Sequence, residues 1–122
     1  YAGRALLLFE PEFGGRHLWF VLTDPEDDQV VAVMLRTAKA FTDPTVILRP
    51  GEHPFIHHDS SVRYSTARHF LVPAIHQALA TGQCHLRQDM AKPLLKRVRD
   101  GLLQSPYTVH VLRAHCLTRF QA

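Results

Sequence analysis

The first half of the chain consists of short apolar or alternating runs separated by turn residues. Runs of this kind, rich in β-branched and aromatic side chains, predict β-strands. The predicted strands are Ala5–Phe9, His17–Thr23, Gln29–Arg36, Thr45–Leu48 and Ser61–Tyr64, the last leading into Ser65–Phe70. The turn at Asp24–Asp28, in which Pro25 fixes φ, joins the second and third runs into a β-hairpin.

The second half has the apolar spacing of amphipathic helices. Apolar residues recur at i, i+3 and i+4 in Leu71–Ala80, and Gly82 follows as a helix-ending residue. A second helix is predicted over Lys92–Leu103, where Pro93 is compatible with the first helical turn. The segment Val109–Leu117 fits either a strand or a last helix.

Strands followed by helices indicate an α+β fold. Five or so short strands suit a small SH3-like β-barrel with appended C-terminal helices better than a sandwich. We therefore predict a single domain over residues 1–122, with a barrel over about 1–67 and a helical region over about 68–122.

Composition and charge add a few constraints. The chain is 46% hydrophobic and 20% charged, as in an ordinary globular domain, and no apolar run approaches the roughly 18 residues of a membrane span. Cys84 and Cys116 lack the spacing of a redox or metal motif, which favours reduced thiols in a cytoplasmic protein. The net charge of +3 is compatible with a polyanionic partner but does not require one.

The unusual count is that of histidine, with 9 residues against 11 Asp plus Glu. Histidine can donate or accept a proton near neutral pH, because its pKa lies there. His17 stands at the start of a predicted strand, and His53, His57 and His58 lie in the loop Gly51–Ser61. The other histidines have no partner that the sequence identifies.

Three segments follow one another in a recognisable order. Arg16–Pro25 (RHLWFVLTDP) is similar to a strand written RPALVLSP, and Val30–Thr37 (VVAVMLRT) is similar to one written VVPITS. Pro44–Tyr64, with its Pro-Gly-Glu turn, is similar in kind to VVLPPGEGGLKRDSYV. Together these segments resemble the MazF/PemK (CcdB-like) toxins of toxin–antitoxin systems, over about Ala5 to Ala67.

The resemblance implies an SH3-like barrel with appended helices that forms a homodimer. It also implies an endoribonuclease that cuts single-stranded RNA without a metal or other cofactor, and a cognate antitoxin protein that blocks its cleft. The arginine at the start of the family's RPALVLSP strand corresponds to His17, with Arg16 one place earlier, and the family's Thr-Ser pair corresponds to Arg36 and Thr37. This altered pattern supports an alternative, a non-catalytic barrel that binds a protein partner or nucleic acid.

Metal-free RNA cleavage needs a base for the 2′-hydroxyl proton, an acid for the leaving 5′-oxygen and a cation for the phosphorane. The candidate catalytic residues are His17, Arg36, Thr37, His57 and His58. Neighbours in an extended chain point to opposite sides, so at most one of the last two is expected to face a site shared with His17. Candidate substrate-binding residues are Arg16, Trp19, His53, Arg63 and Tyr64.

Other interpretations of the same residues are weaker. Trp19, Phe55 and Tyr64 can offer stacking faces to bases, although Trp19 and Phe55 fit a core better. The three loop histidines with Asp59 contain possible ligands of zinc, but their spacing matches no standard zinc motif. Neither Ser60 nor Cys84 lies in a nucleophile motif. We therefore predict no metal site and no cofactor.

Overall fold

A computed structural model describes residues 1–120 of the chain. Within this range the strands and helices are β1 (Ala5–Glu10), the short 3-10 helix η1 (Pro11–Phe13), β2 (Gly15–Val21), β3 (Gln29–Thr37), β4 (Ile47–Leu48), β5 (Ser60–Leu71), α1 (Val72–Thr81), β6 (Cys84–Arg87), α2 (Lys92–Gln104) and α3 (His110–Phe120). The predicted α+β class is confirmed.

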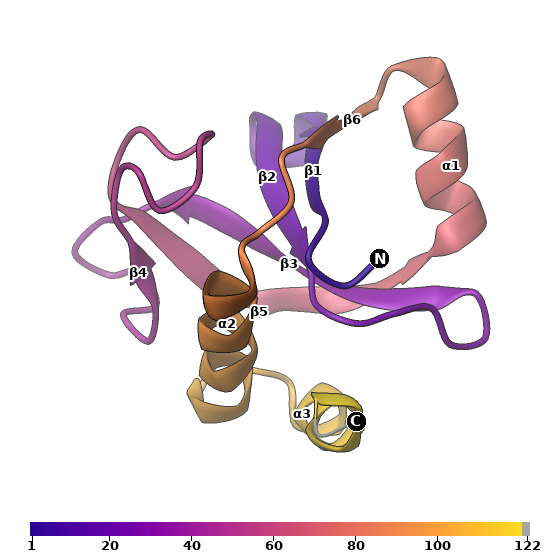
Figure 1. Cartoon of the computed structure of the whole chain (residues 1–122). Helices are drawn as coiled ribbons and strands as arrows, with labels where there is room; N and C mark the ends of the chain where they lie inside the picture. Colours follow the sequence, from indigo (N-terminus) through magenta and orange to yellow (C-terminus); the bar gives the residue numbers. More distant parts are fainter. Residues whose placement is uncertain (121–122) are drawn as a thin grey trace.

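The strands of residues 1–120 form one curled antiparallel sheet (Figure 1). Its order is β4-β5-β3-β2-β1-β6, so that β4 and β6 lie at its two edges. The long strand β5 pairs with β3 over almost its whole length, with a register shift between Ala32 and Met34. The sheet therefore has the form of an open half-barrel.

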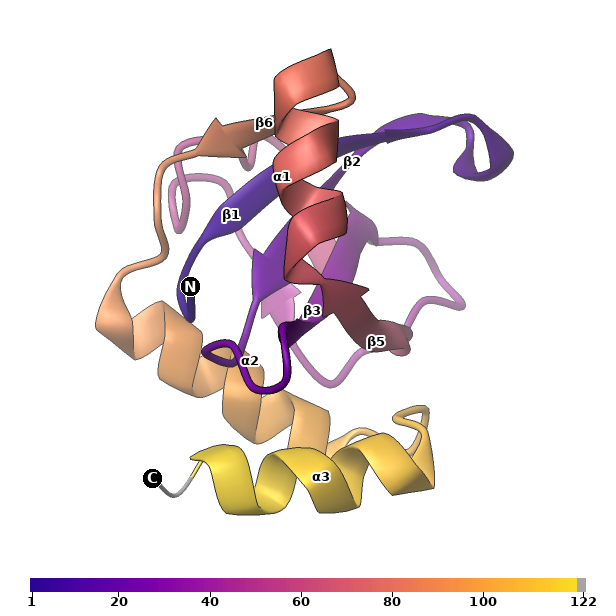
Figure 2. The same ribbon diagram turned by 90° about the vertical axis from the view of Figure 1, so that its right-hand side faces the viewer.

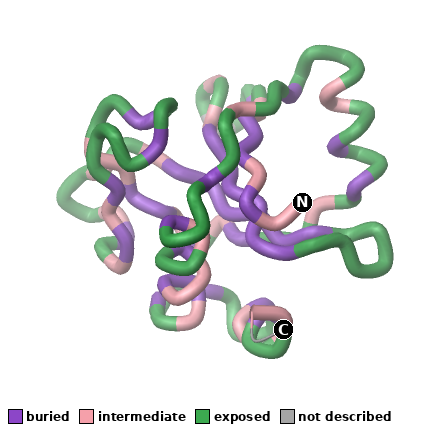
Figure 3. Tube along the Cα trace, in the orientation of Figure 1, coloured by how far each residue is buried: buried purple, intermediate pink, exposed green. Residues whose placement is uncertain are grey.

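Helices cover both faces of this sheet (Figures 1 and 2). Successive side chains of a strand point to opposite faces, which divides the apolar residues into two cores. Trp19 packs with Ile75 on the side of α1, whereas Phe20 packs with Val98 and Cys116 on the side of α2 and α3. Figure 3 shows the resulting run of buried positions along the central strands.

The predicted hairpin is present as β2 and β3. Glu26 and Gln29 bridge its turn, and Asp27 and Asp28 between them have φ of 51° and 58°. Two consecutive residues with positive φ make the turn that matches the right-handed twist of the strands, and aspartate tolerates this conformation. The acidic residues after Pro25 therefore predict the turn in the sequence and also adopt the backbone conformation that the turn requires.

Several predicted boundaries are wrong. Residues 61–70 belong to one strand of 12 residues, β5, and β4 is only 2 residues long. The region after residue 68 is not entirely helical, because β6 pairs there with β1. Its four residues, Cys-His-Leu-Arg, are too few to show a period of two. The segment Val109–Leu117 is helical and lies within α3.

Close packing at Gly101 fixes α2 against β5. A Cβ atom on Gly101 would lie 2.1 Å from the Tyr64 hydroxyl oxygen and 2.5 Å from Cγ2 of Val46. The same hydroxyl donates a hydrogen bond of 2.7 Å to the backbone oxygen of Val98. The helix can approach the sheet this closely only because position 101 has no side chain.

Candidate functional site

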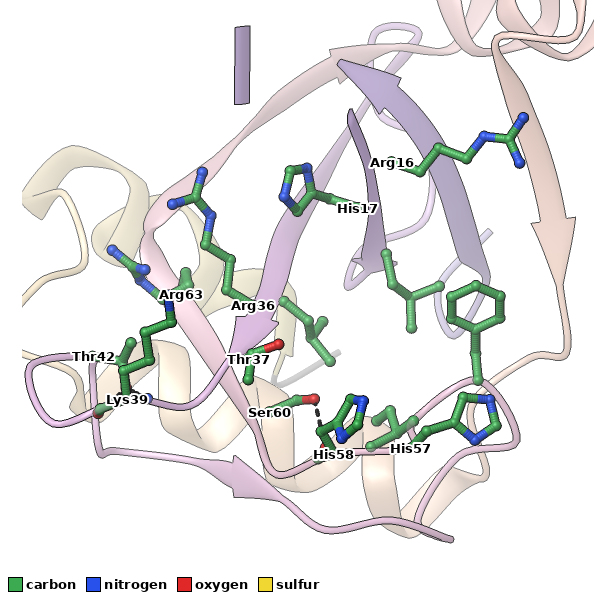
Figure 4. A pocket seen from close by; sticks show the side chains of 14 residues that line it. Arg16, His17, Arg36, Thr37, Lys39, Thr42, His57, His58, Ser60 and Arg63 are labelled. Atoms are coloured by element: carbon green, nitrogen blue, oxygen red, sulfur yellow. Dashed lines mark hydrogen bonds between the residues drawn. The ribbon is translucent and has the colours of Figure 1, made fainter. Parts of the chain in front are cut away.

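The site forms where β2 and β3 separate. Their ladder ends at the pair Trp19 and Met34, although both strands continue. Two positions further, the same register would pair His17 with Arg36, but β2 there keeps its hydrogen bonds to β1, and β3 keeps its own to β5. The divergence opens a pocket of about 640 Å³ (Figure 4).

Most of the predicted site residues line this one pocket. They are Arg16, His17, Arg36, Thr37, His57, His58 and Arg63. They come from β2, β3, β5 and the loop of residues 49–59, which are distant in sequence. The remaining lining residues are Leu18, Leu35, Lys39, Thr42, Phe55, Ile56 and Ser60.

The pocket is strongly cationic. Arg16, Arg36, Lys39 and Arg63 line it, and within residues 1–120 no aspartate or glutamate does. Four arginines outside the pocket, Arg49, Arg68, Arg97 and Arg119, form salt bridges with carboxylates, as Arg49 does with Asp59 at 2.7 Å. In the described part of the chain, no carboxylate forms a salt bridge with Arg16, Lys39 or Arg63. Such a pocket favours an anion, and arginine suits a phosphate in particular.

His17 lies in β2, opposite Leu8 of β1, and its ring is half-buried. Its Nδ1 atom is buried and has no hydrogen-bond partner among the described residues, which leaves Nε2 as the nitrogen available to a ligand. Burial and the positive charge of Arg36 lower the pKa of His17, while Glu10 raises it to a smaller extent. Both larger effects favour the neutral imidazole form of His17.

Arg36 and Arg63 can act on the same anion. Arg36 faces Ser61 across the β3–β5 ladder, and Arg63 is two residues beyond Ser61 on β5. The two arginines are thus diagonal neighbours on one face of the sheet, within reach of each other's side chains. Figure 4 shows their head groups on the same side of the pocket, with Arg36 extending toward His17.

The opposite wall comes from the loop that precedes β5. Both His57 and His58 line the pocket, so the expectation that only one would face it is wrong. That expectation assumed an extended strand, whereas the chain at these two residues is irregular. Figure 4 places His58 beside Ser60 and Thr37, and the Ser60 hydroxyl donates a hydrogen bond of 2.9 Å to the backbone oxygen of His58.

Three predicted substrate-binding residues lie in the interior instead. Trp19, His53 and Tyr64 are 1%, 2% and 0% exposed, and none of them lines the pocket. An aromatic ring that is this deeply buried has no face to offer a nucleobase. Tyr64 alternates with Arg63 on β5 and points toward α2, whereas Trp19 lies on the same face as His17 and packs on the side of α1.

The polar atoms of these three buried residues form hydrogen bonds within the protein, which makes their burial favourable. The Trp19 indole donates a hydrogen bond of 2.8 Å to Glu10, whose other carboxylate oxygen lies 3.0 Å from Arg68. The Nε2 atom of His53 donates a bond of 2.6 Å to the backbone oxygen of Gln88. The first two contacts join strands β1, β2 and β5, and the third joins the loop before β5 to the segment after β6.

Three polar pocket residues, Lys39, Thr42 and Ser60, were missed by the sequence prediction, and Phe55, which was considered as a stacking face, was assigned to the core instead. Lys39 and Thr42 lie in the loop that directly follows Arg36 and Thr37. Their closeness in sequence to these two predicted site residues was a signal that could have identified them. This loop is anchored by Asp43, which accepts a bond of 2.7 Å from the hydroxyl of Ser105. The signal for Phe55 was an aromatic residue within a polar, histidine-rich loop.

The metal-binding interpretation of the loop histidines has no support in the geometry. Within residues 1–120 no three His, Cys, Asp or Glu side chains are grouped as metal ligands would be. The ring of His53 is engaged by the backbone, at Nε2 with the oxygen of Gln88 and at Nδ1 with the N–H of Phe55. Cys84 and Cys116 are both buried free thiols, and burial raises the pKa of Cys116 to about 11.

Comparisons with known proteins give no further assignment. The chain matches no protein-family model and no curated protein sequence. Among the described residues, no helix combines the length and the apolar character needed to cross a membrane. The interpretation of the pocket therefore rests on its own residues.

Proposed function

We propose that this protein is an endoribonuclease of the MazF/PemK kind, built on an SH3-like barrel, that cleaves single-stranded RNA by general acid–base catalysis. The observation that carries the proposal is one pocket that gathers histidines and arginines and, within residues 1–120, is lined by no carboxylate. The resemblance over about residues 5–67 supports it, because its segments supply the pocket's walls.

His17 has the properties of the general base. Its neutral imidazole can accept the proton of the ribose 2′-hydroxyl at Nε2. The 2′-oxygen then attacks phosphorus, and the bond from phosphorus to the 5′-oxygen breaks. The products are a 2′,3′-cyclic phosphate and a new 5′-hydroxyl end.

The two diagonal arginines would hold the phosphate and the charge that develops on it. Arg36 and Arg63 can each donate two parallel hydrogen bonds to phosphate oxygens. The bound phosphate also offsets the positive charge of Arg36, which in the empty pocket disfavours protonation of His17. Substrate binding therefore makes His17 a stronger base at the moment when it is needed.

His58 is the better placed candidate for the general acid. It lies across the pocket from His17 and beside the hydroxyls of Thr37 and Ser60 (Figure 4). As an imidazolium it would give its proton to the leaving 5′-oxygen, which balances the proton taken by His17. Thr37 would position the phosphate between the two histidines.

The partners follow from the same proposal. Single-stranded RNA is the substrate, since only an unpaired strand can place its ribose and phosphate inside the pocket. A cognate antitoxin protein that occupies the pocket, and a homodimer of this chain, are the partners that the resemblance implies. The mechanism as written uses side chains alone and calls for no metal ion or cofactor.

The test is cleavage of single-stranded RNA in the presence of EDTA. We expect the wild-type protein to yield 2′,3′-cyclic phosphate ends, and His17→Ala to lower the rate about 10²- to 10⁴-fold. His85→Ala is the matched control, because His85 is an exposed histidine of β6 outside the pocket. Intact RNA, or cleavage that His17→Ala leaves unchanged, contradicts the proposal.

A second candidate is a barrel that binds RNA or a protein without cleaving it. One observation favours it: within residues 1–120 the buried Nδ1 of His17 has no hydrogen-bonded group of the kind that usually orients a catalytic imidazole. RNA that binds in the assay above but stays intact, with binding lost on Arg63→Met, would select this second function.

A further inference from the structure

Phe55 differs from the other apolar residues that line the pocket within residues 1–120, because Leu18, Leu35 and Ile56 are buried. Phe55 is 37% exposed and lines the pocket among arginines and histidines. An apolar ring on a cationic wall gains nothing from a free phosphate. It does suit a ligand that carries an anion and a flat apolar group together, as a nucleotide does.

The backbone around Phe55 is held in place by a buried histidine. The Phe55 N–H donates a hydrogen bond of 3.1 Å to Nδ1 of His53, whose Nε2 donates to the backbone oxygen of Gln88. The His53 ring also packs against Phe20 of the sheet, with the centroids 5.6 Å apart. The ring of Phe55 is therefore carried on a loop that is tied to the core and to the end of β6.

Side chains flank the Phe55 ring outside and inside the pocket. The guanidinium carbon of Arg87 lies over it, 5.3 Å from its centroid, and Arg87 is not among the pocket-lining residues. The ring of His57, which does line the pocket, lies 6.4 Å away at an angle of 47°. Arg87 supports the ring by a cation–π contact from outside the pocket.

We propose that Phe55 is the stacking platform for a nucleobase of the bound strand. The inference rests on the proposed function and adds a substrate contact to it. The base would lie on Phe55 while Arg36 and Arg63 hold the neighbouring phosphate. Every base has an aromatic face, so this contact supplies affinity for single-stranded nucleic acid of any sequence.

The test compares two oligonucleotides that cannot be cleaved. Both are single-stranded and 2′-O-methylated, and the second has abasic sites in place of its bases. Phe55→Ala is expected to weaken binding of the first about 5- to 150-fold and to leave binding of the second unchanged. Phe41→Ala is the matched control, because Phe41 is 101% exposed and lies outside the pocket.

Each result has a distinct meaning. An equal loss of affinity for both oligonucleotides on Phe55→Ala, or no loss for either, overturns the stacking role and leaves the endoribonuclease proposal standing. Failure of the wild-type protein to bind either oligonucleotide overturns the proposed function itself. Phe55→Trp gives a direct signal: we expect tryptophan fluorescence to be quenched by the oligonucleotide with bases and not by the abasic one.

Discussion

The positive charge of Arg36 acts on His17 and so affects the pH at which this histidine takes up a proton. The arginine's charge and the burial of the ring both lower the pKa of His17 below its ordinary value. We expect Arg36→Met to raise this pKa toward its ordinary value, because the contribution of the arginine disappears while burial and the smaller, opposite effect of Glu10 remain. An NMR titration of the His17 ring measures the change directly.

A matched control separates this local effect from a general change of charge. Lys96→Met removes one positive charge from α2 outside the pocket, next to Asp100, and should leave the His17 titration where it was. Equal shifts in both variants would show that Arg36 does not act on His17 through proximity.

Inorganic phosphate supplies a related prediction. If Arg36 and Arg63 bind it, its negative charge should raise the pKa of His17 in the wild-type protein. Addition of phosphate at constant ionic strength, with chloride as the comparison, tests this by the same titration. No shift with phosphate would argue against an anion held beside His17.

Sequence analysis found the charged side chains of the site better than the aromatic ones. Arg36, His17 and Arg63 were identified because segments resembling a known family carry them. Trp19 and Tyr64 were misplaced because an aromatic residue on a strand can face a helix or a pocket with the same local sequence. Only the positions of α1 and α2 decide between these outcomes.

At the scale of one element, the contact between α2 and β5 depends on Gly101. Gly101→Ala would place a methyl group 2.1 Å from the Tyr64 hydroxyl, which forces the helix away from the sheet. We expect a loss of about 2 kcal/mol in the free energy of unfolding, after the gain of about 1 kcal/mol in helix propensity. Urea unfolding measures it, as a midpoint lowered by about 1 M.

The double variant Tyr64→Phe, Gly101→Ala checks the cause. Removing the hydroxyl takes away the nearest atom, so the loss in the double variant should be smaller than the sum of the single losses. Gln104→Ala, an exposed position at the end of α2, should leave the urea midpoint almost unchanged. If the loss of stability in the double variant equals the sum of the two single losses, the Tyr64 hydroxyl is not the group with which the new methyl group clashes.

The elements were predictable where they were long and periodic. The helices α1 and α2 and the hairpin of β2 and β3 follow from spacing and turn residues alone. The strand β6 was missed because its four residues form a strand only by pairing with β1. Its existence depends on a partner about eighty residues away in sequence, which no local pattern records.

At the scale of the whole molecule, α3 contacts the turn of the β2–β3 hairpin and the strand β5. Arg119 forms an ion pair with Glu26, and the ring of His115 meets that of His69 edge to face, with the centroids 4.8 Å apart. Burial, Arg119 and His69 lower the pKa of His115, and Glu26 raises it to a smaller extent. The polar and charged groups around this contact are Thr23, Asp24, Glu26, Asp27, Gln29, His69, His115 and Arg119.

The docking of α3 should therefore weaken in mild acid. Because the unfolded chain binds a proton at His115 more readily than the folded one, this contribution is complete above about pH 6.5 and is lost as the pH falls below it. We expect lower hydrogen-exchange protection of the α3 amides at pH 5 than at pH 7.5. His115→Gln should reduce this difference.

His17 provides the comparison, since its pKa is also lowered. His17→Gln should alter the pH dependence of global stability without changing the pH dependence of α3 protection. Protection of α3 that is the same at both pH values in the wild-type protein would contradict a role for His115 in the docking.

The end of the β2–β3 ladder at Trp19 and Met34 has a mechanical consequence. His17 belongs to the half of the sheet that contains β1, whereas Arg36 and Arg63 belong to the half that contains β5. A motion of these two halves about the last shared rung would change the distance between His17 and the two arginines. A strand of RNA that contacts both halves of the sheet would hold them together, and its binding would raise the melting temperature of the protein.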